Sequence, residues 1–357
     1  MRLFACDACT NPVHFDNTAC VACGHRLGFV PELGRMTALE PAGDHLVSPA
    51  LGRDVVPCAN AAHDACNWLL PAARAGELCP ACRHNRTIPA LDTPETLAAF
   101  RRITAAERHL FYSLLAWGLH APTRSEDAVA GLAFDFLADE IAADGTVTPV
   151  MTGHADGVIT LAIAEADDAE REARRTRLGE PYRTLLGHFR HEIGHYWWDR
   201  LVRDHGRLET FRAVFGDERA DYGASLARHY ADGPPADWRQ HFVSAYASAH
   251  PWEDFAETWA HHMHMVDALE TARAFGLTLD PRGPAGESLS LEIDFRPYDA
   301  PDLATLTAAW PPLTVAVNAI NRSLGQPDVY PFVLTPSIEA KLGFVHDLVV
   351  AQRVRSE

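Results

Sequence analysis

Residues His191-Glu192-Ile193-Gly194-His195 have the types and the spacing to bind and use a metal ion. On a helix, residues four apart lie one turn above each other on the same face, so both imidazoles can reach one ion. Zinc is the metal that fits two histidines in this arrangement. Glu192 lies beside the pair, where it can take a proton from a metal-bound water. The motif therefore predicts a catalytic zinc site with His191 and His195 as ligands and Glu192 as general base.

The motif needs a helix to present it, and the flanking sequence from Gly179 to Gly206 predicts one long helix. Pro181 suits the first helical turn, and Gly206 suits the position just past the end. Gly187 and Gly194 lie on nearly one face and would let another element approach closely. Apolar residues recur at three- and four-residue steps and form one stripe, and polar residues form a second stripe beside it. The apolar stripe contains Tyr182, Leu185, Leu186, Phe189, Ile193, Tyr196 and Trp197. The polar stripe contains His188, His191, His195 and Asp199. The alternative is a structural helix with surface histidines.

A catalytic zinc usually keeps three protein ligands and one water, so a third ligand is expected after this helix. One candidate is Glu218 or Asp221, about two dozen residues past the motif. The other is Glu253, in a segment that begins a helix with a proline in its first turn and continues with Glu257 on the same face. The acids that do not bind the metal are expected to form a structural ion pair or a helix cap.

All eight cysteines fall in the first quarter of the chain and form two sets of four. The first set has two C-x2-C pairs separated by ten residues, which is the spacing of a short zinc ribbon. The sets are Cys6, Cys9, Cys20 and Cys23, and Cys58, Cys66, Cys79 and Cys82. We expect two closed tetrahedral zinc sites, in which His25 or His63 could replace a cysteine. The alternatives are iron, or disulfides in an oxidising compartment.

The charge of the chain argues against nucleic-acid partners. The 357 residues carry a formal net charge of -17, and residues 1–90 contain seven arginines against eight acidic residues. A nucleic-acid binder would carry a basic patch instead. We therefore expect the cysteine-rich segment to be a folded cap or a docking module for a protein partner.

Neither a secretory signal nor a membrane span is expected. Residues 1–11 have no apolar segment behind a basic start, so we predict a cytoplasmic protein. The longest uncharged run, residues 303–321, contains two adjacent prolines, an asparagine and several threonines, which do not suit a membrane span.

The chain after residue 91 predicts a mainly helical fold with a small sheet. Capping-box patterns that begin at Asp92 and at Thr104 each precede an apolar-periodic segment. The expected helices cover about 93–102, 105–118, 134–143, 301–324 with an interruption at Pro311 and Pro312, and 336–353.

Residues 157–164 are the best strand candidate, because they are rich in β-branched side chains. In zinc peptidases an edge strand pairs with the extended substrate backbone, and this strand is predicted to do so. His154 and Asp156 precede it in what we interpret as a plain polar turn. Residues 28–53, rich in Gly and Pro, are interpreted as the connection between the two cysteine sets.

The segment around Glu253 resembles the lethal-factor type of gluzincin. A Glu-x-x-x-Glu arrangement lies on a helix about sixty residues after HExxH, with a tyrosine seven residues before its first Glu. The resemblance implies that Glu253 binds zinc, that Glu257 lies in the outer shell and that Tyr246 helps to stabilise the oxyanion. Glu218 and Asp221 instead resemble the Glu-x-x-x-Asp arrangement of thermolysin-like enzymes, but they stand three residues apart rather than four.

A longer resemblance covers most of residues 1–275. The strings that carry it are CNWLL, EADDAERE, GEPYRTLLGHFRHEIGHYWWDRL, FGDERADY and HPWEDFAETWAHHMH. They are similar to the bacterial family of zinc-binding metallopeptidases with an N-terminal zinc ribbon. With the residues, this resemblance predicts an α+β protein with a double zinc-ribbon module over 1–90, a mainly helical zincin-like domain over 91–276, and a helical extension packed on it over 277–357.

The resemblance implies a peptidase with a peptide or protein substrate, one catalytic zinc ion and two structural zinc ions. Two other functions stay open at this point. One is a zinc-dependent hydrolase of a non-peptide amide. The other is a non-catalytic protein whose zinc ribbons bind a partner.

Overall fold

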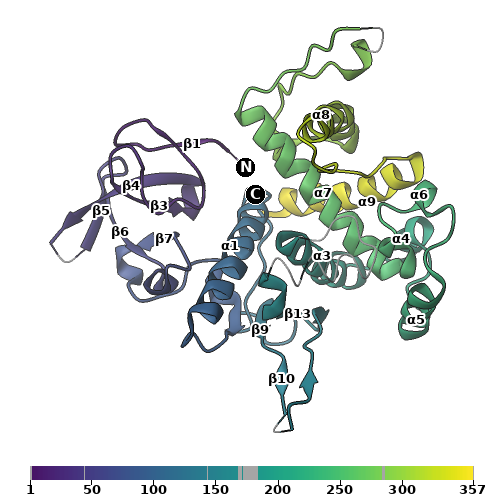
Figure 1. Ribbon diagram of the computed structural model, residues 1–357, viewed down its shortest axis with the longest axis horizontal. Coiled ribbons are helices and arrows are strands. Elements are labelled where there is room, and N and C mark those ends of the chain that lie inside the picture. The colour runs from purple at the N-terminus through teal and green to yellow at the C-terminus, as the bar shows by residue number, and fades with distance from the viewer. Residues whose placement is uncertain are drawn as a thin grey trace. The chain divides into compact units, whose positions relative to one another are not determined.

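The computed structural model describes residues 2–43, 45–142, 144–167, 171, 184–283 and 286–356. The chain forms two compact units, Met1–Ala116 with His120–Ala173 and Trp117–Leu119 with Arg174–Glu357 (Figure 1). The fold is α+β as predicted, because a cysteine-rich β region is followed by a mainly helical region with a small sheet. The predicted domain boundaries at residues 90 and 276 stay a prediction.

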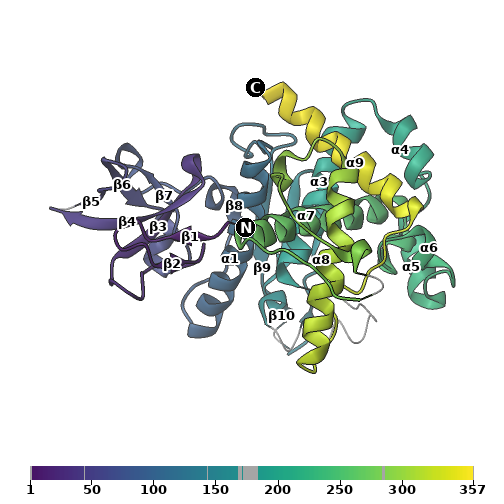
Figure 2. The same cartoon turned by 90° about the horizontal axis from the view of Figure 1, so that it is seen from above.

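The cysteine-rich region consists of two antiparallel sheets. A small sheet pairs β1 (Phe4–Ala5) with β2 (Pro12–Val13). A larger sheet pairs each strand with the next along the chain: β3 (Arg26–Val30), β4 (Arg35–Ala42), β5 (His45–Ser48), β6 (Arg53–Pro57) and β7 (Leu69–Pro71) (Figure 2). The interpretation of residues 28–53 as a connection was therefore wrong. Gly34 has a left-handed φ of 57° in the β3–β4 turn, while most apolar residues of these strands are buried.

An aromatic core joins the two cysteine sets into one body. Phe15 lies between the pairs of the first set, and its ring centroid is 4.8 Å from that of Phe29 in β3. Phe29 in turn packs against Trp68, which lies within the second set, at 5.2 Å. All three side chains are almost fully buried, so the two sets share one hydrophobic core.

A single helix, α1 (Pro94–Ala116), replaces the two helices predicted over 93–102 and 105–118. The first capping signal is displaced by one residue: Thr93, and not Asp92, caps the helix, since its Oγ1 accepts a hydrogen bond from the backbone nitrogen of Thr96 at 3.2 Å. The second was wrong. Thr104 is fully buried inside the helix, and its hydroxyl donates to the carbonyls of Phe100 and Ala65.

A four-stranded sheet completes the first unit, in the order β12 (Gly153–Ala155), β13 (Val158–Ala162), β9 (Ala133–Leu137) and β8 (Asn85–Thr87). The helix predicted over 134–143 was wrong, because this segment forms the buried strand β9 and the short strand β10 (Glu140–Ile141), which pairs with β11 (Val147–Thr148). Burial of Phe134 and Phe136 explains the strand.

The strand predicted over 157–164 is confirmed as β13, but its predicted place at a sheet edge was wrong. It is hydrogen-bonded on one side to β12 and on the other to β9. A strand in the middle of a sheet has no free backbone groups for a substrate. The polar turn before it is confirmed, with left-handed φ at Asp156 and Gly157.

The second unit is helical. Its helices are α3 (Leu185–Trp198), continued by a π-helical turn over Asp199–Arg203, α4 (Leu208–Phe215), α5 (Tyr222–Asp232), α6 (Trp238–His241), α7 (Pro251–Ala274), α8 (Leu303–Ser323) and α9 (Pro336–Ser356). Helix α7 contacts α3, α8 and α9 (Figure 2). The long helix predicted from Gly179 to Gly206 is shorter than expected, because Thr184 has an extended backbone and caps α3 at its start. Pro181 and Tyr182 lie outside the described residues. Gly206 has the left-handed φ expected after the end of the helix.

Helix α9 confirms the helix predicted over 336–353, but the interruption predicted in α8 was wrong. The helix continues through Pro311 and Pro312, and its packing on α7 and α9 outweighs the two missing backbone hydrogen bonds. Among the described helices, α8 alone has the length and apolar character to cross a membrane. The predicted absence of a membrane span therefore stays a prediction.

Candidate metal centres

Helices α3 and α7 pack closely enough to bring the HExxH motif against Glu253. The contact depends on Gly194, the glycine inside the motif. A Cβ atom at this position would lie 2.9 Å from the Cα of Ala256 and 3.1 Å from the Cβ of Trp259. A larger residue would push the two helices apart, so the sequence expectation for Gly194 is confirmed.

Three side chains from these helices point their metal-binding atoms at one another. His191 Nε2 lies 3.0 Å from Oε2 of Glu253 and 3.2 Å from Nε2 of His195. His195 Nε2 lies 3.5 Å from the same Oε2. Two atoms bound tetrahedrally at the usual zinc distances would lie about 3.3 Å apart. The donor set and its spacing therefore fit one zinc ion.

Each ligand candidate is held by a second side chain or ring. His191 Nδ1 lies 2.7 Å from Glu257 Oε1, and the hydroxyl of Ser244 donates to the other oxygen of Glu257. A proton on Nδ1 leaves the Nε2 lone pair for the metal. The ring of Trp252 lies 3.7 Å from that of His195, measured between centroids.

The charges of this group are strongly coupled. Burial alone would lower the pKa of His191, but its hydrogen bonds to Glu253 and Glu257 raise that pKa well above the usual value. Burial would raise the pKa of Glu253, but the two histidines hold it well below the usual value. A cation is therefore favoured among these three side chains.

Glu192 lies next to this group. Its side chain is 7% exposed, and its Oε2 atom has no partner in the described part of the chain. Burial raises the pKa of this carboxyl group, while His191 and His195 act in the opposite direction. Buried carboxylates without partners are rare and are found at functional sites, which supports the role predicted for Glu192.

The competing third-ligand candidates have structural roles. Glu218 pairs with the guanidinium of Arg212, whose Nε lies 2.9 Å from Oε2. Asp221 caps α5 and accepts a hydrogen bond from the nitrogen of Ala224 at 2.8 Å. Among the described residues, the group around the HExxH histidines contains Glu253 and neither of these acids.

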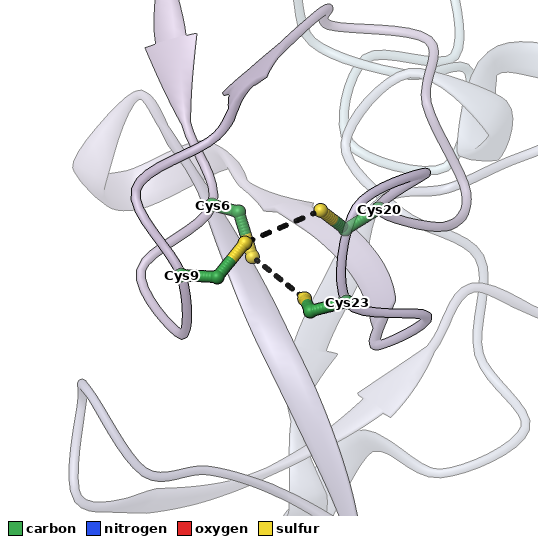
Figure 3. A group of neighbouring side chains, drawn as sticks. All are labelled: Cys6, Cys9, Cys20 and Cys23. Carbon is green, nitrogen blue, oxygen red and sulfur yellow. Dashed lines mark hydrogen bonds between the residues drawn. The ribbon is translucent and has the colours of Figure 1, made fainter.

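The first cysteine set forms a second candidate centre. The four sulfur atoms of Cys6, Cys9, Cys20 and Cys23 point toward one another (Figure 3). Cys6 Sγ lies 3.7 Å from Cys23 Sγ, and Cys9 Sγ lies 3.6 Å from Cys20 Sγ. Tetrahedral thiolates on zinc would lie about 3.8 Å apart. The cysteines are free, so the disulfide alternative was wrong for this set.

The second cysteine set forms a third centre and is fully buried. Cys66 Sγ lies 3.7 Å from Cys79 Sγ. The backbone nitrogen of Cys79 donates to the sulfur of Cys58, and that of Trp68 donates to the sulfur of Cys66. Such bonds stabilise thiolates, and all eight cysteines are free. Neither histidine proposed as a substitute ligand belongs to a described group; His25 lies beside Cys23, with Nδ1 3.3 Å from its sulfur.

Comparison with known proteins agrees with this geometry. Residues 96–348 match the family described as "Putative zinc-binding metallo-peptidase", and residues 3–93 match a zinc-ribbon domain. The chain belongs to this zinc-binding metallopeptidase family. Uncharacterized proteins of Mycobacterium bovis and of two Mycobacterium tuberculosis strains are 43% identical to it over 351 residues, which are 98% of this chain and 95% of theirs. No solved structure matches the chain.

Tyr246 lies near the site, as the family resemblance implies. It begins a 3-10 turn, Tyr246–Ala249, just before α7, and its ring centroid is 5.8 Å from that of His191. Burial raises the pKa of this phenol well above its usual value, so Tyr246 keeps its proton at neutral pH. Its role toward an oxyanion stays a prediction.

Three contributors were not predicted from the sequence: Tyr222, Ser244 and Trp252. Trp252 could have been suspected because it precedes Glu253. Tyr222 and Ser244 carry no signal of their own, because they belong to other segments and reach the site only through the fold.

A buried ion pair fixes α7 at the residue after Glu253. Lys341 on α9 is the only lysine in the chain, and its Nζ lies 2.6 Å from Oδ2 of Asp254. The same Nζ donates to the carbonyl of His241. The side chains of the pair are 7% and 0% exposed, so loss of either partner would leave a buried charge.

Proposed function

We propose that this protein is a zinc-dependent metallopeptidase that hydrolyses peptide bonds in a peptide or protein substrate. The observation that carries the proposal is the arrangement of His191, His195 and Glu253 around one point. The carboxylate of Glu192 lies beside them, and its Oε2 atom has no hydrogen-bond partner among the described residues. Three protein ligands leave a position for water, whereas a structural site has four.

The chain's own residues supply the remaining chemistry. Zinc held by the two histidines and Glu253 would polarise the scissile carbonyl and make a nearby water more acidic. Glu192 accepts the proton of the attacking water and returns it to the leaving amine. Glu257 keeps His191 in the tautomer that presents Nε2. Tyr246, as a neutral phenol, donates a hydrogen bond to the developing oxyanion.

The same proposal extends to the cysteine-rich region. Two sets of free thiols with zinc-like spacing suit a reducing compartment, which supports a cytoplasmic location. The acidic net charge of -17 supports a protein partner over a nucleic acid. The location and the partner are not given by the family assignment, and they are inferred only from the cysteine spacing and the net charge.

The test compares the full chain with its Glu192→Gln variant. Zinc-loaded protein is incubated with a peptide library and with amide-linked small molecules, and products are identified by mass spectrometry. We expect peptide cleavage in the wild type and a loss of about 10²- to 10⁴-fold in the variant, with bound zinc retained. Cleavage of small amides alone would favour a non-peptide amidase, and an active variant would exclude Glu192 as the base.

A matched variant tests the third ligand. Glu218→Gln changes the acid of the competing candidate, whose side chain pairs with Arg212. It is expected to keep zinc at the site, whereas Glu253→Gln is expected to lose it. The opposite result would transfer the ligand role to the segment before α5.

A further inference from the structure

The two oxygens of Glu253 have different partners. Oε2 faces the two imidazoles, at 3.0 Å from His191 Nε2 and 3.5 Å from His195 Nε2. Oε1 accepts a hydrogen bond from the phenol of Tyr222 at 2.6 Å. The carboxyl group is 1% exposed, so its orientation is decided by these neighbours and not by water. The phenol thus selects which oxygen faces the histidines.

From this geometry we infer that Tyr222 is a positioning residue for Glu253: its hydroxyl fixes the carboxylate so that a single oxygen is presented to the metal. The inference rests on the proposed zinc site. Without this donor the carboxylate would be free to rotate, and Oε2 would no longer be held facing the two imidazoles, which would weaken the ligand set.

Tyr222 also reaches the ring that lies against His195. Its ring centroid is 5.8 Å from that of Trp252, which in turn lies 3.7 Å from that of His195. One side chain therefore contacts the surroundings of two ligand candidates. The hydroxyl acts on Glu253 and the ring acts on Trp252, so the two effects can be separated by removing the oxygen alone.

The helix that carries Tyr222 contributes little to the hydrophobic core. Helix α5 has no buried residue along its described length, and Tyr222, its first residue, is 40% exposed. A tyrosine at this place adds little core packing, yet it donates to a buried carboxylate. The position of Tyr222 therefore contributes more to the orientation of Glu253 than to the stability of the fold.

The test is Tyr222→Phe in the full chain, which removes only the hydroxyl. Zinc affinity is measured by competition with a chromogenic chelator, and cobalt substitution reports the ligand geometry through its visible spectrum. We expect zinc binding at one of three sites to weaken about 10- to 100-fold, with a changed cobalt spectrum, and the two cysteine sites to stay unchanged. Unchanged or tighter zinc binding would overturn the inference.

Asp221→Ala is the matched control, because it removes the cap of the same helix and leaves the hydroxyl in place. It is expected to lower the thermal stability of the metal-free protein slightly and to leave zinc affinity as in the wild type. An equal loss of zinc affinity in this variant would assign the effect to α5 as a whole and overturn the role of the hydroxyl. These readouts do not depend on turnover, so they stand whether or not Glu192→Gln abolishes peptide cleavage.

Discussion

The cysteine centres and the His191–His195–Glu253 centre suit the same ion but differ in what surrounds it. Each cysteine set offers four sulfurs, and backbone N–H groups donate to sulfurs of the buried set. The other centre offers three ligands and keeps Glu192 beside them, and the Oε2 atom of Glu192 has no hydrogen-bond partner within the described ranges. Four ligands close a coordination sphere and stabilise a fold, whereas three ligands and a free base leave room for a reaction.

The two kinds of centre also depend on different parts of the fold. The cysteines come from short turns whose strands are two to eight residues long. The catalytic candidates come from α3 and α7, two helices of 14 and 24 residues that bury polar side chains between them. A zinc site with four protein ligands can thus stabilise a region that has only a small hydrophobic core. A site with three protein ligands needs rigid helices to hold those ligands in place.

The largest expected effect comes from opening a closed site. Cys79→Ser removes a sulfur from the fully buried set, and the remaining thiolates would lose the metal that organises the region. We expect the cooperative unfolding transition of the first unit to disappear and bound zinc to fall from three ions to two.

The matched variant is Cys23→Ser in the first cysteine set, because Cys23 is exposed. Its expected loss of stability is smaller, because water can reach this side of the set. Circular dichroism with temperature and zinc analysis measure both variants. Equal losses in the two would contradict the difference in burial between the sites.

A second prediction concerns the order in which the ions leave. A chelator added to protein with three zinc ions should remove one ion first, from the centre with an open position, without unfolding the chain. Peptide cleavage, thiol reactivity and circular dichroism are followed together. If thiols become reactive before cleavage is lost, the division between open and closed sites is wrong.

The smallest effect concerns a histidine on α7 that holds no metal. His262 is 1% exposed, and its Nε2 lies 3.1 Å from Nδ1 of His346. Burial lowers the pKa of His262 from 6.5 to about 3 in the folded chain. Between these two pKa values the unfolded chain binds a proton at His262 and the folded chain does not. The contribution of His262 to stability is therefore largest above pH 6.5 and decreases as the pH falls toward 3.

Urea unfolding of the second unit at pH 6.5 and pH 5 checks this sign. The single histidine should reduce the free energy of unfolding by about 1.6 kcal/mol over that interval, and His262→Gln should remove this part of the slope. His241→Gln, on the exposed helix α6 of the same unit, is the control and should keep the wild-type slope. An unchanged slope in His262→Gln would contradict a neutral buried imidazole.

The sequence predicted the elements in which local rules and tertiary packing agree. The HExxH helix, the C-x2-C pairs, β13 and α9 all carry signals within a few residues of one another. Prediction from the sequence failed where tertiary packing outweighed a local signal. Thr104 resembles a cap but is buried inside α1, and residues 28–53 contain turn residues that connect strands of one sheet.

Spacing along the chain was enough to predict metal binding, because residues three or four positions apart lie close together in a turn or on one face of a helix. Only the tertiary structure decided which acid joins the histidines and which residues orient it. Glu253 lies 58 residues after His195 in the sequence. Gly194 nevertheless allows the helix of Glu253 to approach, and Tyr222 comes from a third segment. Contacts of this kind depend on how separate helices pack, which no local pattern encodes.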